Sequence, residues 1–288
     1  MFAANFEYYR AGSVIEASRL LAQHPGARLL AGGHSLIPLL KLRLSAPGTI
    51  IDIGRISELR GIVANKGGLL IGALTTHTEL AASPDVKKYA EALAEASGQV
   101  GDPAVRNRGT IGGNVAHADP ASDPPIVLAA LKARFGITGP QGQRTVEVSN
   151  FFQGLMSTAL AENEILTSIE IPARQTGEGM AYVKFAHPAS RYAVIGVAAV
   201  ITLNKDTCST VQVAVGGLVP RPTRASSVEA TLLGKKLSAE NINHAANQVS
   251  KDLGGEILGD VFASPDYRRA MAAIYVNRAL SAAAQRTS

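Results

Sequence analysis

The stretch "AGGHSL" at residues 31–36 separates the apolar runs "RLL" and "IPLLKLRL", and "TIGGN" at residues 110–114 repeats its pattern of an apolar residue, two glycines and a polar residue. Glycine pairs lack Cβ atoms and permit positive φ, so successive amides can point into one concavity that binds an anion, most often a phosphate. By spacing alone, two unrelated tight turns are the default interpretation. Two such turns support a dinucleotide better than one does, because its diphosphate offers oxygens to both.

Other nucleotide-binding fingerprints are absent from the sequence. No G-x-G-x-x-G opens a helix, which leaves a Rossmann site without support. Gly234, Lys235 and Lys236 lack the upstream glycine and the Ser/Thr of a phosphate-binding P-loop. A bound dinucleotide would therefore be held by loops and not by a single helix dipole.

The composition is that of a globular protein large enough for two or three subdomains, with 288 residues, 46% of them hydrophobic and 18% charged. No apolar run reaches the ~18 residues of a membrane-spanning helix. The best candidate, at residues 192–203, predicts a buried strand. The N-terminus lacks the basic start and apolar block of a secretion signal. We therefore expect a cytoplasmic protein without an integral membrane segment.

Cysteine content and charge narrow the function further. The single cysteine, Cys208, excludes a disulfide framework and fits a reducing compartment. It also excludes an iron–sulfur cluster held by this chain alone, because such a cluster uses about four thiolates. The net charge of +5 suggests an acidic ligand or partner, but the basic residues are scattered and aromatics make up only 5% of the chain. These features argue against nucleic-acid binding.

Helix boundaries are predicted from local signals. Capping-box spacing and Ser-Pro pairs predict helix starts at 13–16, 76–79, 226–229, 83–84 and 264–265. Glycines predict where three helices end, namely Gly98 for 83–97, Gly234 for 226–233 and Gly254 for 238–253. Most of the connections between these helices are short β-rich runs.

The order of these elements predicts an α+β fold. Short strands and the hairpin "GITGPQGQRTVEV" indicate two small α+β lobes over residues 1–175, roughly 1–55 and 56–175. After the Pro/Gly-rich segment 172–179, three longer strands are followed by three helices. This order predicts an antiparallel sheet covered by helices over residues 176–288.

Three stretches resemble one protein family closely: "LLAGGHSLIPLLKLRL", "IGALTTHTEL" and "VRNRGTIGGNVAHADPASDPP". They are similar to the FAD-binding medium subunit of molybdenum hydroxylases, nearest to the aerobic carbon monoxide dehydrogenase branch and more distantly to the flavin domain of xanthine dehydrogenase. The resemblance extends from "FEYYRAGSV" to "DYRRAMAAIYVNRAL", almost the full chain. It implies FAD held between two α+β lobes, followed by a C-terminal α+β flavoprotein domain.

The resemblance also implies which residues contact FAD. Both glycine turns would bind the diphosphate through backbone amides, and their residues are Ala31, Gly32, Gly33, His34, Ser35, Thr110, Ile111, Gly112, Gly113 and Asn114. Asp123 precedes two prolines and an apolar run, so from the residues alone it could cap a helix or accept from ligand hydroxyls. The resemblance implies contact with the polar chain of the flavin. Val100, Leu166, Lys184 and Tyr192 would lie by its ring.

One residue departs from the family pattern. Relatives commonly carry an acidic residue just before the aromatic, whereas this chain has Arg191 before Tyr192. A nearby cation stabilises a reduced anionic flavin more than an acid does. Arg191 therefore bears on the flavin potential and on the choice of electron acceptor.

The function implied by the resemblance is that of an oxidoreductase subunit in an electron relay. Substrate would be hydroxylated at a molybdopterin centre on a large partner chain, electrons would cross [2Fe–2S] clusters on a small chain, and FAD here would pass them to an external acceptor. A dimer of such heterotrimers is expected. The substrate, whether carbon monoxide, a purine such as caffeine, an N-heterocycle or an aldehyde, would be decided on the molybdenum chain.

Two other functions stay open. The chain could be a self-sufficient FAD oxidase, although no acid–base pair stands beside the flavin motifs. Ser35 begins like the nucleophile elbow of a serine hydrolase, but Ile37 replaces the glycine that this motif requires. We expect neither a catalytic side chain nor a metal site, because the histidines that we place in loops show no metal-site spacing: His34, His77, His117 and His187.

Overall fold

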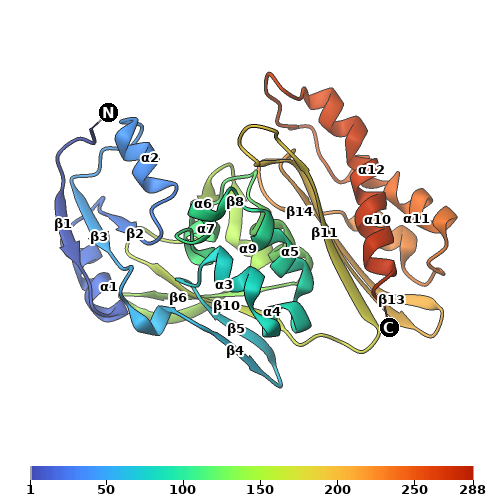
Figure 1. Cartoon of the computed structure of the whole chain (residues 1–288), viewed down its shortest axis with the longest axis horizontal. Coiled ribbons are helices and arrows are strands. Elements are labelled where there is room, and N and C mark those ends of the chain that lie inside the picture. The colour runs from blue at the N-terminus through green and yellow to red at the C-terminus, as the bar shows by residue number, and fades with distance from the viewer. Residues whose placement is uncertain (1, 288) are drawn as a thin grey trace.

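The computed structural model describes residues 2–287 and builds the chain in three parts, each around its own sheet (Figure 1). The first part has a parallel sheet with strand order β1-β3-β2. Its elements are β1 (Glu7–Arg10), α1 (Val14–Gln23), β2 (Arg28–Leu30), α2 (Leu36–Lys41) and β3 (Thr49–Asp52). The first glycine turn connects β2 to α2, at the carboxyl end of a parallel strand, where ligands commonly bind.

The second part contains a five-stranded antiparallel sheet with the order β4-β5-β10-β6-β7. The predicted hairpin is confirmed as β6 and β7. The strands are β4 (Ile62–Asn65), β5 (Gly68–Gly72), β6 (Arg134–Gly139), β7 (Gly142–Glu147) and β10 (Ile165–Pro172), with a small pair β8 (Phe152–Gly154) and β9 (Ser157–Thr158). The helices are η1 (Ser57–Leu59), α3 (His77–Ala82), α4 (Pro84–Tyr89), α5 (Glu91–Gln99), α6 (Pro103–Arg106), α7 (Ile111–His117), α8 (Asp123–Ala130) and α9 (Val148–Phe151).

Helix starts in the first two parts follow the predicted caps, but one predicted helix is divided. Thr76 and Glu79 form a complete capping box at α3, and Ser83 caps α4 by accepting from Val86 N. The expected helix 83–97 is interrupted at Ala90, whose extended φ of −149° separates α4 from α5. Gly98 lies inside α5 and does not end it, because it keeps a helical conformation up to the C-cap.

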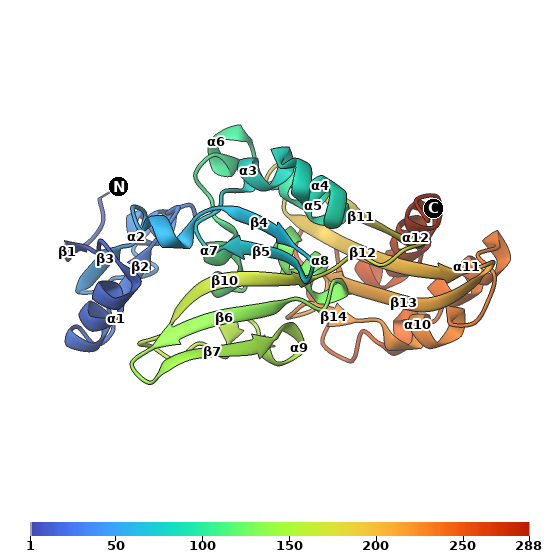
Figure 2. The same ribbon diagram turned by 90° about the horizontal axis from the view of Figure 1, so that it is seen from below.

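The third part has the predicted antiparallel sheet with helices on one face (Figure 2). Its strands are β11 (Glu178–Ala186), β12 (Ala193–Asn204), β13 (Thr207–Gly216) and the short β14 (Thr223–Arg224). Its helices are α10 (Ser226–Leu232), α11 (Ala239–Ala246), η2 (Val249–Lys251) and α12 (Pro265–Ala284). Together with the sheets of the second part, these elements confirm the α+β class.

Two helix predictions in this part were wrong in detail. Ser226 does not cap α10, since the carboxylate of Asp252 accepts from Ser226 Oγ and from Ser227 N at 3.0 Å. Glu229 does not complete a capping box either, because it accepts from Val213 N at 2.8 Å. The helix expected over 238–253 ends as an α-helix at Ala246 and continues as the separate turn η2.

Helix α8 joins the second and third parts. All eight of its residues are buried, and it packs against β12 and β13 on the face of that sheet opposite α12. One apolar cluster accordingly includes Ile126 of α8 and Val200 of β12. The first residue of α8, Asp123, is thereby fixed between the two parts. Within residues 2–287, none of the helices combines the length and the hydropathy needed to cross a membrane.

Candidate functional site

The fold brings the two glycine turns into contact. A Cβ added to Gly32 would lie 2.1 Å from the carbonyl oxygen of Arg108, just before the second turn. A Cβ on Gly113 would lie 3.9 Å from the Cβ of Ala31. Gly32 is therefore required by the close approach of the two turns, which makes them two walls of one site.

The first turn has the free amides expected of an anion site. Gly33 has a φ of +79°, which glycine adopts easily and other residues rarely do. Among residues 2–287, no protein acceptor pairs with the backbone amides of residues 32–36. His34 is exposed, and Ser35 makes no capping hydrogen bond to α2. Consecutive free amides of this kind form a concavity for an anion.

The second turn is built differently, because its amides already have partners within the chain. Ile111 N donates to Thr75 O at 2.9 Å and Gly112 N donates to Ala73 O at 2.8 Å. Gly113 N donates to Thr110 Oγ1 at 3.2 Å, which caps α7. Positive φ is confined to Gly33, since neither Gly112 nor Gly113 adopts it. Of the two turns, only the first uses the positive φ that glycine permits.

Asn114 connects the second turn to the start of α8. Its Nδ2 donates to Ser122 Oγ at 3.1 Å. Its Oδ1 is buried and has no hydrogen-bond partner in the described chain. A buried acceptor without a partner is costly unless a ligand or a water satisfies it. A hydroxyl of a ligand is one donor that would satisfy this atom.

Asp123 lies at the centre of a buried polar cluster. Its side chain is 5% exposed, and Oδ2 accepts from Lys184 Nζ at 2.8 Å while Oδ1 accepts from the Tyr182 hydroxyl at 2.6 Å. Burial raises the pKa of Asp123 above its ordinary value, and the Lys184 ammonium and the Tyr182 hydroxyl limit that rise. Helix capping is not its role, because Ser122 is the N-cap of α8 and Asp123 follows it.

Sequence reasoning missed Tyr182. Its phenol is buried, and burial together with the Asp123 carboxylate raises its pKa well above the ordinary value. A usable signal was present, because Tyr182 and Lys184 are two residues apart on β11 and so share one face of the strand. Only the position of Asp123 in space shows that this face meets α8.

The remaining predicted residues lie in three places: beside this cluster, in an exposed loop and in the core. Lys184 Nζ also donates to the carbonyl of Gln99 at 3.2 Å, which places Val100 beside the cluster. Tyr192 is 47% exposed in the loop between β11 and β12, and burial and the carboxylates of Asp119 and Asp123 raise its pKa. Leu166 is 5% exposed in the apolar core.

Arg191 occupies the left-handed region with a φ of +61° and is exposed. Its positive charge lowers the pKa of Asp123, although less than Lys184 does. The residue that departs from the family pattern therefore acts electrostatically on the cluster.

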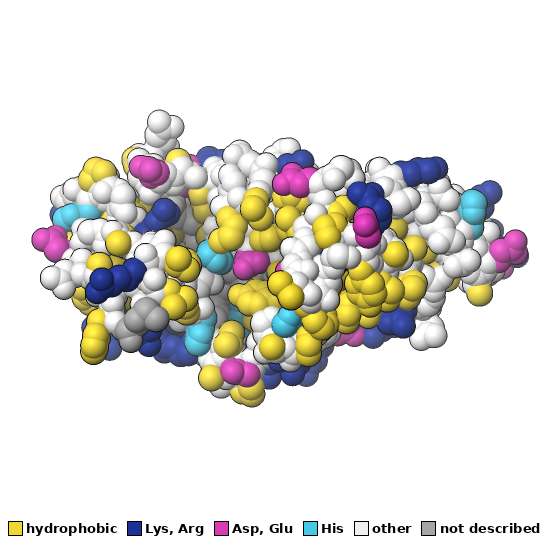
Figure 3. All heavy atoms as spheres, turned by 90° about the horizontal axis from the view of Figure 1, so that it is seen from above, with side chains coloured by type: hydrophobic (Ala, Val, Ile, Leu, Met, Phe, Trp, Pro, Cys, Tyr) yellow, Lys and Arg dark blue, Asp and Glu magenta, His cyan; other side chains and the backbone are white. Residues whose placement is uncertain are grey.

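Figure 3 shows a hollow between the N-terminal part and the middle of the molecule, with acidic and histidine side chains among hydrophobic ones.

Two of the four histidine placements were wrong. His77 is the first residue of α3 and is 2% exposed, and His117 ends α7, so neither lies in a loop. Burial, with smaller contributions from Arg106 and His34, lowers the pKa of His77 to about 4. Among the described residues, the Ser35 hydroxyl has no hydrogen-bonded base, and no three metal-ligating side chains cluster.

The residues present fit FAD on structural grounds. Free amides in the first turn suit a diphosphate, the unpartnered Asn114 Oδ1 suits a hydroxyl donor, and the Asp123 carboxylate retains acceptor capacity. These three features lie along a continuous path, because Gly32 touches Arg108, Asn114 bonds Ser122, and Ser122 precedes Asp123. The site is suited to an extended ligand that carries both anionic and hydroxyl groups.

Comparison with known families shows which cofactor the chain binds. Residues 4–174 match the family described as the FAD binding domain in molybdopterin dehydrogenase, and residues 180–283 match the CO dehydrogenase flavoprotein C-terminal domain. The chain therefore belongs to the FAD-binding flavoproteins of the molybdopterin dehydrogenases, and FAD is its cofactor.

Individual relatives are medium chains of dehydrogenases. The chain is 41% identical to the carbon monoxide dehydrogenase medium chain of Hydrogenophaga pseudoflava over 98% of each chain. It is 38% identical to the glyceraldehyde dehydrogenase medium chain of Sulfolobus acidocaldarius, covering 88% of this chain and 90% of that one. The solved carbon monoxide dehydrogenase of H. pseudoflava matches with a TM-score of 0.96 and 42% identity over 100% of both chains. This chain is thus the medium, FAD-binding subunit of an oxidoreductase of the molybdenum hydroxylase type.

Proposed function

We propose that this chain is the electron-transfer subunit of a molybdenum hydroxylase, in which its FAD takes electrons from [2Fe–2S] clusters on a small partner chain and delivers them to an external acceptor. A large partner chain would hold the molybdopterin centre and choose the substrate. The assembly would be a dimer of heterotrimers in the cytoplasm, where a free thiol such as Cys208 persists. When bound, the flavin supplies the redox chemistry, and the protein binds and orients it.

The first part of this proposal concerns the phosphate end of the cofactor. The amides of residues 32–36 would hold the diphosphate, since they have no other acceptor among residues 2–287. The second turn would contribute less through its amides, because these donate to protein groups, and more through Asn114 Oδ1. Apart from this difference, we keep the residues of both turns as the expected contacts of the diphosphate.

The second part concerns the ring end. Asp123 would accept from the polar chain of the flavin, while Lys184 and Tyr182 hold its carboxylate in one orientation. Holding a nearly buried carboxylate from both oxygens fixes its rotamer and excludes water from the inner side of the site. Val100, Leu166 and Tyr192 would contact the ring, and Arg191 would influence its potential through the same cluster.

The observation that carries the relay is the cysteine content of a chain that matches medium subunits along nearly its whole length. Cys208 is the sole cysteine, it is 1% exposed, and burial raises the pKa of its thiol to about 11. A neutral, buried thiol is a poor metal ligand. Electrons that reach FAD through iron–sulfur clusters must therefore come from another chain.

Anaerobic flavin bleaching tests the proposal. The FAD-loaded chain alone should contain neither iron nor molybdenum, and it should not bleach on addition of the substrate of its complex. Adding the molybdenum and iron–sulfur chains should restore bleaching at the rate of turnover. Bleaching of the lone chain at a catalytic rate would instead support the self-sufficient oxidase. A Ser35→Ala variant that keeps bleaching in the complex would show that the electron relay does not use the Ser35 hydroxyl.

A further inference from the structure

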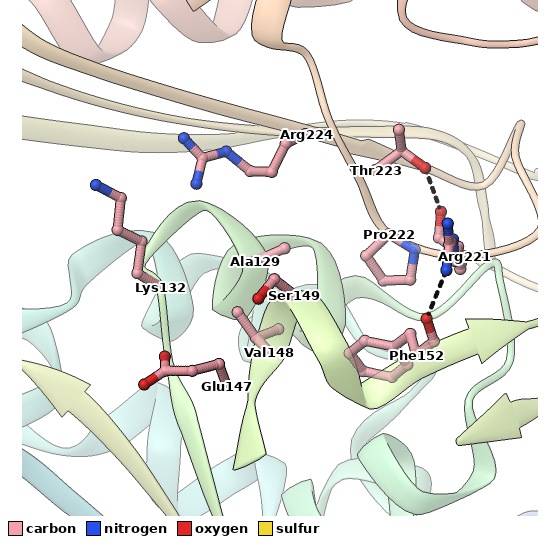
Figure 4. Close-up of a pocket in the computed structure, with 10 residues that line it drawn as sticks. All are labelled: Ala129, Lys132, Glu147, Val148, Ser149, Phe152, Arg221, Pro222, Thr223 and Arg224. Carbon is pink, nitrogen blue, oxygen red and sulfur yellow. Dashed lines mark hydrogen bonds between the residues drawn. The ribbon is translucent and has the colours of Figure 1, made fainter. Parts of the chain in front are cut away.

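A second concave site lies away from the two glycine turns. A cavity of about 460 Å³ opens at the seam between the second and third parts (Figure 4). One wall comes from the end of α8 and from α9, and the other comes from the segment around β14. Its lining residues are Ala129, Lys132, Glu147, Val148, Ser149, Phe152, Arg221, Pro222, Thr223 and Arg224.

The cavity has an excess of positive charge. Lys132, Arg221 and Arg224 line it, and Glu147 is the one carboxylate among its lining residues. Among residues 2–287, neither Lys132 nor Arg221 forms an ion pair. Figure 4 shows the Lys132 and Arg224 side chains extending on the same side of the cavity, with Arg221 beyond Pro222. Unpaired cations that line one cavity attract an anion.

The two arginines are held in place before any ligand arrives. Arg221 Nη1 donates to the Phe152 carbonyl at 3.0 Å, and Arg224 Nε donates to Glu229 Oε1 at 2.7 Å. Thr223 Oγ1 donates to the Arg221 carbonyl at 3.0 Å, which fixes the segment between them. Each guanidinium keeps other N–H groups for a ligand. Fixing these side chains in advance reduces the entropy lost on binding.

Lys132 reaches the cavity from the C-terminal end of α8. Its φ of +52° belongs to an ordinary helix C-cap, because Ala133 N donates to Leu128 O at 3.0 Å and Lys132 N donates to Ala129 O at 3.4 Å. These two bonds fix the backbone from which the Lys132 side chain extends. Figure 4 shows that side chain at one side of the cavity.

The rest of the lining is apolar and comes from Ala129, Val148, Phe152 and Pro222. The volume lies in the range of about 300–1,000 Å³ typical of small-molecule sites. An acidic side chain reaching in from a partner would fill only part of it. We propose that this cavity binds a small organic anion, whose carboxylate or phosphate contacts Lys132 and Arg224 and whose apolar body packs against Pro222 and Phe152, toward Arg221.

Calorimetric titration of the FAD-loaded chain with phenyl phosphate tests this proposal, with inorganic phosphate and phenol as the anionic and apolar halves of the probe. We expect saturable binding of phenyl phosphate at one site, inorganic phosphate about tenfold weaker because it buries no ring, and no binding of phenol. Lack of saturable phenyl phosphate binding would overturn the proposal. So would equal affinities for phenyl phosphate and inorganic phosphate, since the apolar wall would then have no role.

Variants assign the binding to this cavity. Lys132→Asn keeps a residue that tolerates the left-handed backbone, and Arg224→Gln removes the guanidinium on the same side of the cavity; each should weaken phenyl phosphate about tenfold. Arg134→Gln is the matched control, because it removes one charge from an exposed pair with Glu170 outside the cavity, and affinity should stay within about twofold. Equal weakening by Arg134→Gln would reduce the effect to net charge and overturn the site.

The assembled complex separates a small ligand from a partner side chain. We expect phenyl phosphate to bind the complex of this chain with its partner chains as tightly as it binds the chain alone. Loss of binding on assembly would show that a partner covers the cavity, and would replace the small anion by an acidic group of that partner. Neither result depends on the electron-transfer role, because the readout is binding and not turnover.

Discussion

The two glycine turns have nearly the same sequence pattern and opposite hydrogen-bonding states. In the first turn the amides of residues 32–36 have no acceptor in the described chain, and Gly33 has a φ of +79°. In the second turn Ile111, Gly112 and Gly113 all donate to protein groups and none has positive φ. One turn therefore leaves its donors free, while the donors of the other are used within the protein.

The comparison shows that a glycine can be required for two different reasons, namely its backbone conformation or the close approach of another chain segment. Gly33 is needed for a backbone conformation, whereas Gly32 and Gly112 are needed because another backbone lies where a Cβ would be. Without Gly32 the turns could not touch, and without Gly112 the second turn could not bond to the end of β5. The ligand site depends on both uses, since free amides must be held against a rigid wall.

The largest effect is expected from Gly112→Ala. Its Cβ would lie 2.5 Å from the Ala73 Cβ and 2.7 Å from the Ala73 carbonyl oxygen, and backbone atoms cannot move aside cheaply. We expect the free energy of unfolding to fall by about 3 kcal/mol, with FAD lost as a consequence. Urea unfolding of the FAD-free chain measures the change without a contribution from ligand binding.

Gly113→Ala is the matched control in the same turn. Its helical backbone accepts alanine, and only Thr110 Oγ1, at 2.9 Å, lies close to the new Cβ. Alanine favours the helix by up to about 1 kcal/mol, so stability should change by less than that amount. If Gly112→Ala were as stable as Gly113→Ala, close approach could not explain the glycine at position 112.

The second prediction concerns the pH dependence of stability and depends on His77, which contacts the start of the second turn. His77 N donates to Gly109 O at 3.0 Å, and the pKa of the ring is lowered from 6.5 to about 4, mainly by burial. The unfolded chain therefore binds the proton first, and stability falls as pH decreases from 6.5 toward 4. At pH 5 the loss relative to pH 7.5 should be about 2 kcal/mol.

His77→Gln removes this titration and should flatten the profile between pH 7.5 and pH 5. The comparison uses the slope of unfolding free energy against pH, since the substitution also changes packing. Asp123 and Glu178, whose pKa values are raised by burial, titrate in both proteins and cancel in the difference. An unchanged slope in the variant would assign the pH dependence to other groups.

Local sequence signals predicted much of the fold, and long-range contacts account for the failures. The capping box at Thr76 and Glu79 was confirmed because both partners lie within one turn of helix. The one expected at Ser226 was wrong because Asp252, distant in sequence, takes the free amide at that helix start. Nothing within a window around Ser226 could have shown this competitor.

The candidate site follows the same rule. The glycine motifs were visible as sequence, but the state of their amides depends on Ala73 and Thr75, which belong to another segment. Likewise Tyr182 and Lys184 were readable as one face of a strand, while their shared partner Asp123 comes from a helix of the second part. Motifs indicate the chemistry, and tertiary structure decides which copy of a motif remains available.

A third test addresses the first turn directly. Gly33→Ala forces a left-handed φ on alanine at a cost of about 1 kcal/mol, and its Cβ would meet the side chains of Ile37, with Cδ1 at 2.7 Å, and of Leu30, with Cδ1 at 3.2 Å. We expect FAD affinity to fall about tenfold, because a relaxed turn no longer aims its amides at the diphosphate. Gly33→Asn should restore part of the affinity, since asparagine tolerates this φ.

The comparison between the turns also predicts that the alanine variants of Gly33 and Gly113 differ in their affinity for FAD. Gly113→Ala should leave FAD affinity within about threefold of wild type, because the amides of the second turn already donate to protein groups. Fluorescence titration of the FAD-free variants gives both values. A loss at Gly113→Ala as large as that at Gly33→Ala would show that the second turn rearranges to bind the diphosphate directly.

The smallest effect on affinity is expected at Tyr192, at the other end of the site. The ring is 47% exposed and its backbone is held by the loop, with its carbonyl accepting from His187 N at 2.8 Å, so its removal leaves the loop in place. Tyr192→Ala should shift the flavin absorption and reduction potential while FAD affinity changes by less than about threefold. Tyr192→Phe keeps the ring and should retain the wild-type spectrum. An affinity loss at Tyr192→Ala that matched Gly33→Ala would mean that the ring end anchors FAD as strongly as the diphosphate does, which would contradict the leading role given to the first turn.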